Sequence, residues 1–95
     1  MNEYCEILVT EWEAGQVVAG RFTFEDGKLS FSATKKYERL MANIMEDKTV
    51  VGEKVFDPAT DPKGWLQSLP IAYAGSILRA RLVSSRHGRT KRNQV

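Results

Sequence analysis

The chain has little of several residue types that define whole classes of protein. It contains one cysteine, which excludes a disulfide framework and a metal site built from several cysteines. No apolar run approaches the roughly 18 residues that a membrane-spanning helix needs. The first residues, Met1–Glu6, carry two acids where a secretory signal requires bases, so we expect a cytoplasmic protein.

Motifs for catalysis and cofactor binding are also absent. The seven glycines are scattered, and none belongs to a phosphate-binding loop or a nucleophile elbow. The only histidine, His87, lies in a basic stretch without neighbouring metal ligands. Cys5 falls on the apolar side of an alternating pattern, which indicates a buried, unreactive thiol. The acids of residues 11–13 and 25–26 lie at expected strand ends and turns. We therefore predict a non-enzyme without cofactor or metal.

What is present is sufficient for one small folded domain. Of 95 residues, 42% are hydrophobic and 27% are charged, which is close to the globular average. The composition changes at Ser84–Ser85, because residues 86–95 contain a single apolar side chain. Such a segment cannot bury enough surface to offset its ordering entropy. We predict one domain over residues 1–83 and a flexible basic tail over residues 84–95.

The first third of the chain predicts an antiparallel β-meander between residues 4 and 33. Apolar and polar residues alternate with a period of two, as in half-buried strands. Asp26–Gly27 separates two alternating runs and indicates a two-residue hairpin turn. The expected apolar face comprises Cys5, Ile7 and Val9, then Val18, Gly20, Phe22 and Phe24, then Leu29, Phe31 and Ala33.

An amphipathic helix is predicted over residues 35 to about 46, with Thr34 as its N-cap. Its apolar residues recur with helical spacing, which favours a core-facing stripe over a methionine-lined binding groove. The stripe should cover the meander, because three short strands need such a cover. It consists of Tyr37, Leu40, Met41, Ile44 and Met45.

A short second helix is predicted from Pro62 to Leu69. Asp61 is its expected N-cap, and Pro62 occupies the first turn, where a missing N–H has no cost. Pro70 is expected to end the helix, and residues 71–76 are expected to form a loop. Trp65 must pack against another element, because two turns of helix are unstable alone.

For two segments the sequence is compatible with two secondary structures each. Gly52–Glu53 lies between Thr49–Val51 and Lys54–Phe56, which predicts either a small hairpin or one strand with a bulge. Residues 77–83 alternate in polarity and favour a strand, with a helix as the alternative. The fold class is thus α+β: an antiparallel meander covered by one amphipathic helix, with a short second helix and a C-terminal strand or helix.

Two stretches, Phe31–Met41 and Asp61–Pro70, stand out beyond their secondary-structure signals. The second is followed by Tyr73, Gly75–Ser76 and Leu78–Ala80. Together, over about residues 31–80, they resemble a family of small uncharacterised bacterial and prophage-associated proteins. The resemblance implies a phage or mobile-element setting, in the cytoplasm, in a phage-infected cell or within a phage particle. It implies no activity and no catalytic residue.

Charge is distributed unevenly along the chain. Residues 1–78 hold twelve acids and eight bases, whereas the chain from Arg79 onward holds six bases and no acid. A basic segment of this kind can contact phosphates or an acidic protein surface. Tyr73 is expected to be exposed and able to stack on a base. The candidate nucleic-acid or partner contacts are Arg79, Arg81, Arg86, Arg89, Lys91, Arg92 and Tyr73.

Two functions fit these features. We favour a small non-catalytic protein-interaction or assembly module, because a core of this size is often supplemented by a protein partner or by homo-oligomerisation. The alternative is a nucleic-acid-binding protein that uses the basic C-terminal strand and tail. Against the alternative, the body is acidic and no known nucleic-acid-binding motif is present. Neither function involves a membrane or a small-molecule substrate.

Overall fold

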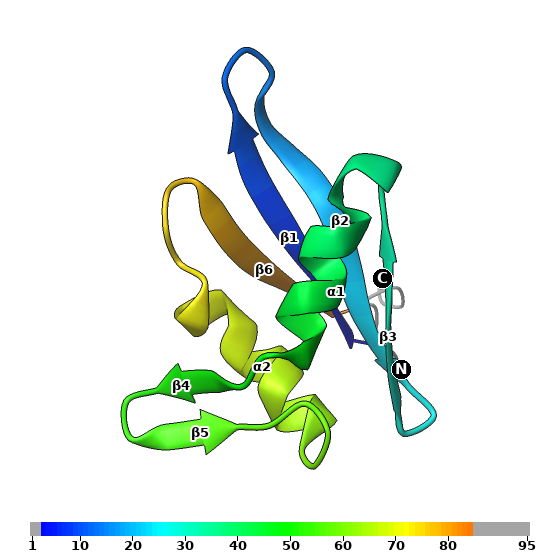
Figure 1. The fold of residues 1–95 in the computed structure, drawn as a ribbon. Coiled ribbons are helices and arrows are strands. Elements are labelled where there is room, and N and C mark those ends of the chain that lie inside the picture. The colour runs from blue at the N-terminus through cyan, green and yellow to red at the C-terminus, as the bar shows by residue number, and fades with distance from the viewer. Residues whose placement is uncertain (1–2, 85–95) are drawn as a thin grey trace, which may run out of the picture.

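The computed structural model describes residues 3–84 and contains two helices, one 3-10 turn and six strands in that range (Figure 1). In chain order the elements are β1 (Glu3–Glu11), β2 (Gly15–Glu25), β3 (Lys28–Ala33), the 3-10 turn η1 (Lys35–Tyr37), α1 (Glu38–Glu46), β4 (Thr49–Val51), β5 (Lys54–Phe56), α2 (Pro62–Ala72) and β6 (Leu78–Ser84). The predicted α+β class is confirmed. The predicted tail, apart from Ser84, lies outside the described residues.

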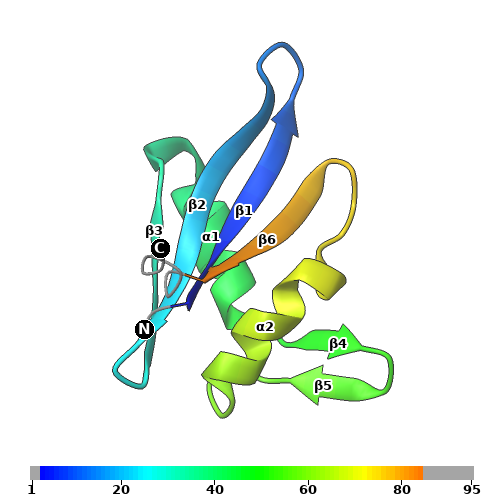
Figure 2. The same ribbon diagram turned by 180° about the vertical axis from the view of Figure 1, so that it is seen from behind.

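The main sheet has four antiparallel strands in the order β3-β2-β1-β6. The meander is therefore confirmed, and residues 78–84 form a strand, as favoured, which returns to pair with β1. Both helices contribute to a core on one face of this sheet. Seen from behind, the strands β1 and β2 lie in front of α1 (Figure 2). The other face of the sheet carries no helix of residues 3–84.

The β2–β3 turn forms as its sequence predicts. Asp26 and Gly27 both adopt positive φ, at 55° and 74°. Two central residues with positive φ define the turn type that matches the twist of a hairpin. The turn thereby fixes the register that pairs Glu25 with Lys28 and Phe22 with Phe31.

The second strand departs from simple alternation. Ile7 pairs with Gly20 whereas Leu8 pairs with Val18, so Ala19 is an extra residue and forms a β-bulge. An extra residue reverses the side-chain alternation beyond it. The prediction that Val18 shares a face with Phe22 is therefore wrong: Val18 lies beside Leu8 and is exposed.

The first helix covers the sheet as predicted, but its start differs. Thr34 makes no side-chain capping bond; its hydroxyl and its backbone N–H both donate to the carbonyl of Ala19, at 3.5 and 3.1 Å. Thr34 therefore occupies the predicted N-cap position, at the start of η1, but its hydroxyl is directed to the carbonyl of the bulge residue Ala19 and does not cap the turn. The α-helix α1 itself begins later, at Glu38. Met41 and Ile44 are buried, which confirms the apolar stripe as core.

The second helix is longer than predicted. Asp61 caps it by accepting a hydrogen bond from the N–H of Gly64 at 3.1 Å. Pro70 does not end the helix, which continues to Ala72. A proline so close to the C-terminus removes only one helical hydrogen bond, and the N–H of Tyr73 closes the last turn by donating to the carbonyl of Leu69 at 2.8 Å.

The segment left open around Gly52 is a hairpin. β4 and β5 form a separate two-stranded sheet, and Gly52 has a φ of 63° in the turn between them. Thr49 is buried against α2, where its hydroxyl hydrogen-bonds to that of Ser68. This pair attaches the inner side of the hairpin to α2.

The core is centred on Trp65, the largest fully buried side chain of residues 3–84. Its ring contacts Phe22 edge to face, with centroids 5.1 Å apart, and its indole N–H donates to the carbonyl of Asp47 at 2.7 Å. The buried cluster consists of Cys5, Ile7, Ala19, Phe22, Met41, Ile44, Trp65, Leu66, Leu69 and Ala80. Neither α1 nor α2 has the length and hydropathy needed to cross a bilayer.

Candidate functional site

The side of the main sheet opposite the helices forms the first candidate surface, here called the open face. The strand register places Arg79 and Arg81 there, as their alternation in the sequence implied. The face is mostly polar, with side chains from all four strands. It comprises Tyr4, Glu6, Leu8, Thr10, Gln16, Val18, Arg21, Thr23, Glu25, Lys28, Ser30, Ser32, Arg79, Arg81 and Val83.

Arginine side chains dominate the electrostatics of the open face. Glu6 lies between Arg21 and Arg81 in the strand register and forms an ion pair with Arg81. The Arg21 guanidinium lies 4.6 Å from the centre of the Tyr4 ring, which is a cation–π contact. Arg79 is exposed and has no ion-pair partner within residues 3–84.

Sequence reasoning missed Arg21 and Tyr4 as members of this surface. Both side chains could have been placed on the polar side of their strands from alternation alone. Their proximity to Arg79 and Arg81 depends on the pairing of β6 with β1, two strands that are far apart in the sequence. No local pattern in the sequence specifies that pairing.

Tyr73 does not belong to the open face. It is half-buried and packs against the core, and its carbonyl accepts a hydrogen bond from the N–H of Ala80 at 2.8 Å. Burial, and secondarily the charge of Asp47, raises the pKa of the Tyr73 hydroxyl. The expectation of an exposed stacking tyrosine is therefore wrong. The remaining predicted contacts, Arg86, Arg89, Lys91 and Arg92, lie outside the described residues.

Cys5 is fully buried between the sheet and the helices, as predicted. Burial is the main cause that raises the pKa of its thiol to about 12. A backbone hydrogen bond from Arg81 lowers this pKa in part, and the negative charge of Glu6 raises it further. Since the thiolate is the reactive form, a thiol of this kind is a poor nucleophile at neutral pH.

We predict that Cys5 reacts with a thiol reagent mainly through unfolded molecules. Labelling of native protein, followed by mass spectrometry, should be slower than labelling in concentrated urea by roughly a thousandfold, which reflects the small unfolded population. Rapid labelling of the native protein would show that the thiol is accessible and would contradict the buried position.

The two acids near the end of β1, Glu11 and Glu13, have different surroundings. Glu11 accepts a hydrogen bond from the Tyr37 hydroxyl and pairs with Lys36 at 2.9 Å. The hydrogen bond from Tyr37 is the main cause that lowers the pKa of the Glu11 carboxyl, and the bond from Lys36 adds to it. The bond to Glu11 is also the main cause that raises the pKa of the Tyr37 hydroxyl. The cluster fastens η1 to the end of β1, while Glu13 lies exposed in the turn that follows.

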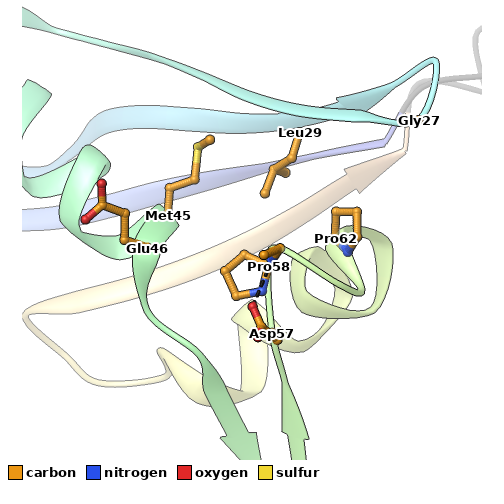
Figure 3. Close-up of a pocket in the computed structure, with 8 residues that line it drawn as sticks. Gly27, Leu29, Met45, Glu46, Asp57, Pro58 and Pro62 are labelled. Atoms are coloured by element: carbon orange, nitrogen blue, oxygen red, sulfur yellow. Dashed lines mark hydrogen bonds between the residues drawn. The ribbon is translucent and has the colours of Figure 1, made fainter.

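A shallow hollow of about 500 Å³ lies between the β2–β3 turn, the end of α1 and the loop before α2 (Figure 3). Leu29 and Met45 point into it, and Asp57 lies at its margin, where its carboxylate accepts a hydrogen bond from the N–H of Ala59 at 2.8 Å. The lining offers no hydroxyl, thiol or imidazole as a nucleophile. It consists of Gly27, Leu29, Met45, Glu46, Asp57, Pro58, Ala59 and Pro62.

Metal binding finds no support in the described part of the chain. Within residues 3–84, no three or more histidine, cysteine, aspartate or glutamate side chains lie close enough together to hold one metal ion. Such clusters are the usual protein ligands of zinc and other divalent metals.

The β4–β5 hairpin forms the second candidate surface. Val50 and Val55 pair directly across its two strands, and each residue is 60% exposed. They point away from α2, because their neighbours Thr49 and Phe56 occupy the inner side. Ile71, at the end of α2, is also exposed.

Comparison with known proteins gives no relative on which a function could be based. No protein-family model matches the chain, and no curated protein or solved structure matches it significantly.

Proposed function

We propose that the protein is a small non-catalytic assembly module that binds a second copy of itself through the β4–β5 hairpin. The observation that supports this most directly is the exposed cross-strand pair of Val50 and Val55. A hairpin with three-residue strands is marginal by itself, and here its inner side is held by α2. The hairpin lies at the margin of the molecule, beside α2 (Figure 1), and both valines on it are exposed.

Burial of these side chains would contribute to association. Apolar area removed from water stabilises a complex by about 25 cal/mol per Å² before the costs of association are subtracted. Glu53 lies in the hairpin turn and Lys54 begins β5, so two copies related by a two-fold axis can oppose unlike charges. This supports a homo-oligomer over a partner of one charge sign. A cytoplasmic or phage-associated location belongs to the same proposal.

The test is the double substitution Val50→Thr and Val55→Thr. Threonine keeps the β-branched shape and strand preference of valine, but replaces a methyl group by a hydroxyl. In sedimentation velocity, the wild-type protein is expected to gain mass with concentration while the double variant stays monomeric. The melting temperature should be nearly unchanged, because exposed positions contribute within about 0.5 kcal/mol.

The matched control is Val18→Thr, which places the same substitution on the open face, where Val18 is 40% exposed. This variant should associate like the wild type. A wild-type protein that remains monomeric at all accessible concentrations, or a control that disrupts association equally, would contradict assembly through the hairpin.

A further inference from the structure

We infer that the open face of the sheet is a binding site for single-stranded nucleic acid, independent of the proposed assembly surface. The first support is the placement of arginine. Residues 3–84 contain four arginines, and Arg21, Arg79 and Arg81 lie on the open face, whereas only Arg39 lies elsewhere, on α1. Phosphate contacts from arginine supply most of the affinity of such sites.

Most acids of residues 3–84 lie away from the open face: of the twelve acids, the strand register places Glu6 and Glu25 on it, and Glu25 lies at its edge, beside Lys28. Glu6 is the acid in the middle of the open face, and its charge is matched by the ion pair with Arg81. Arg79 and Arg21 therefore keep their charge available to a ligand. Arg21 lies on β2 and Arg79 on β6, which are the two neighbours of β1 in the sheet. The axes of β2 and β6 are therefore roughly 10 Å apart. An extended sugar-phosphate chain crossing β1 reaches both arginines.

The contact between Arg21 and Tyr4 provides a stacking platform. The half-buried Tyr4 ring supports the guanidinium of Arg21, which is itself exposed. A guanidinium plane held in this way stacks on an unpaired base, and stacking contributes about 1–3 kcal/mol per base. Hydroxyl groups of Thr23, Ser30 and Ser32 continue the face toward β3 and can donate to phosphate or sugar oxygens.

The geometry favours a single strand over a duplex. Duplex readers place a helix or a two-stranded ribbon in a groove. No helix of residues 3–84 lies on the open face, and the projecting β1–β2 hairpin has Glu11 and Glu13 at its tip, which phosphates would repel. A broad sheet with arginines and a stacking plane instead fits unpaired bases laid across it.

The test measures fluorescence anisotropy of a labelled 20-nucleotide single strand of mixed sequence with the full chain, over a series of salt concentrations. The double substitution Arg21→Gln and Arg79→Gln removes two phosphate contacts. The salt slope should fall by about 1.4, at about 0.7 per contact on single strands, and affinity at low salt should fall at least roughly tenfold. The control, Arg39→Gln with Lys63→Gln, removes two exposed charges from the helix side.

The control should bind within about twofold of the wild type. Equal weakening by the control would show that overall charge, and not the open face, determines binding, and would overturn the inference. Unchanged binding by the double variant would place the contacts elsewhere in the chain and would also overturn it. If the double variant does not fold, Arg79→Gln alone serves, because Arg79 makes no ion pair within residues 3–84.

The variant Arg21→Lys separates stacking from charge. Lysine keeps the charge but lacks the planar guanidinium. We expect affinity for the single strand to fall about fivefold or more, with the salt slope unchanged. A duplex of the same length should bind more weakly than the single strand to the wild-type protein. Wild-type affinity for Arg21→Lys, or preference for the duplex, would overturn the single-strand assignment.

Discussion

Replacing Trp65 by alanine is expected to lower the free energy of unfolding by about 3–5 kcal/mol, as truncation of a buried tryptophan does. The side chain is fully buried, contacts Phe22 edge to face and donates its indole N–H to the Asp47 carbonyl. Its loss would leave a cavity between α2 and the sheet and an unpaired carbonyl at the end of α1. Domains of this size have a total stability of about 5–15 kcal/mol, so much of the margin would be lost.

The measurement is urea denaturation followed by circular dichroism. Trp65→Phe is the matched control, because it keeps an aromatic ring against Phe22 and removes the indole N–H together with part of the ring volume. We expect a loss of about 1–3 kcal/mol for this control, from the unpaired carbonyl of Asp47 and the smaller ring. If Trp65→Ala cost less than about 1 kcal/mol, α2 would not be packed on the sheet as described here.

The elements that local sequence determines were predictable. Alternation over β1 to β3 and the Asp26–Gly27 turn specify a meander, because both signals act between neighbouring residues. The cap of α2 by Asp61 was predictable for the same reason, since the capping oxygen and the N–H of Gly64 are three residues apart. Burial of Cys5 followed from its place in the alternation.

The errors arise where tertiary structure overrides a local signal. Pro70 locally predicts a helix end, because it lacks the backbone N–H of a helical hydrogen bond. The helix nevertheless continues to Ala72, since Leu66 and Leu69 pack in the core and stabilise it. Tyr73 reads as a loop residue, but the chain turns it toward the core. Val18 reads as apolar and inward, but the bulge at Ala19 turns it outward. No local pattern marks the bulge.

The candidate surfaces were predictable only in part. Arg79 and Arg81 alternate with apolar residues, which indicates a polar strand face wherever β6 docks. That Arg21 and Tyr4 lie on one surface with Arg79 and Arg81 depends on which sheet edge β6 joins; β6 pairs with β1 and also packs against α2. The exposure of Val50 and Val55 required knowing that their hairpin stays outside the main sheet.

The second large effect is expected at Gly20, which lies at the bulge where β2, β3 and α1 meet. A Cβ atom built there would lie 2.4 Å from the backbone oxygen of Ser32, and 3.0 Å from both the Cα of Ala33 and the Cε of Met41. The methionine end can move, but the backbone of β3 moves only if its pairing with β2 is distorted. Gly20→Ala should therefore cost about 3 kcal/mol, at the upper end of overpacking effects.

Gly75→Ala is the matched control for Gly20→Ala, because its Cβ would meet only the carbonyl oxygen of Leu78, at 3.4 Å, an ordinary contact. Neither glycine has a positive φ, so the comparison isolates steric space from backbone strain. Thermal denaturation should show a large loss for Gly20→Ala and less than about 0.5 kcal/mol for Gly75→Ala. Hydrogen exchange should rise in β3 for Gly20→Ala, because relief of the clash separates β3 from β2. Equal melting temperatures for the two variants would show that β3 does not approach Gly20 as closely as the bulge requires.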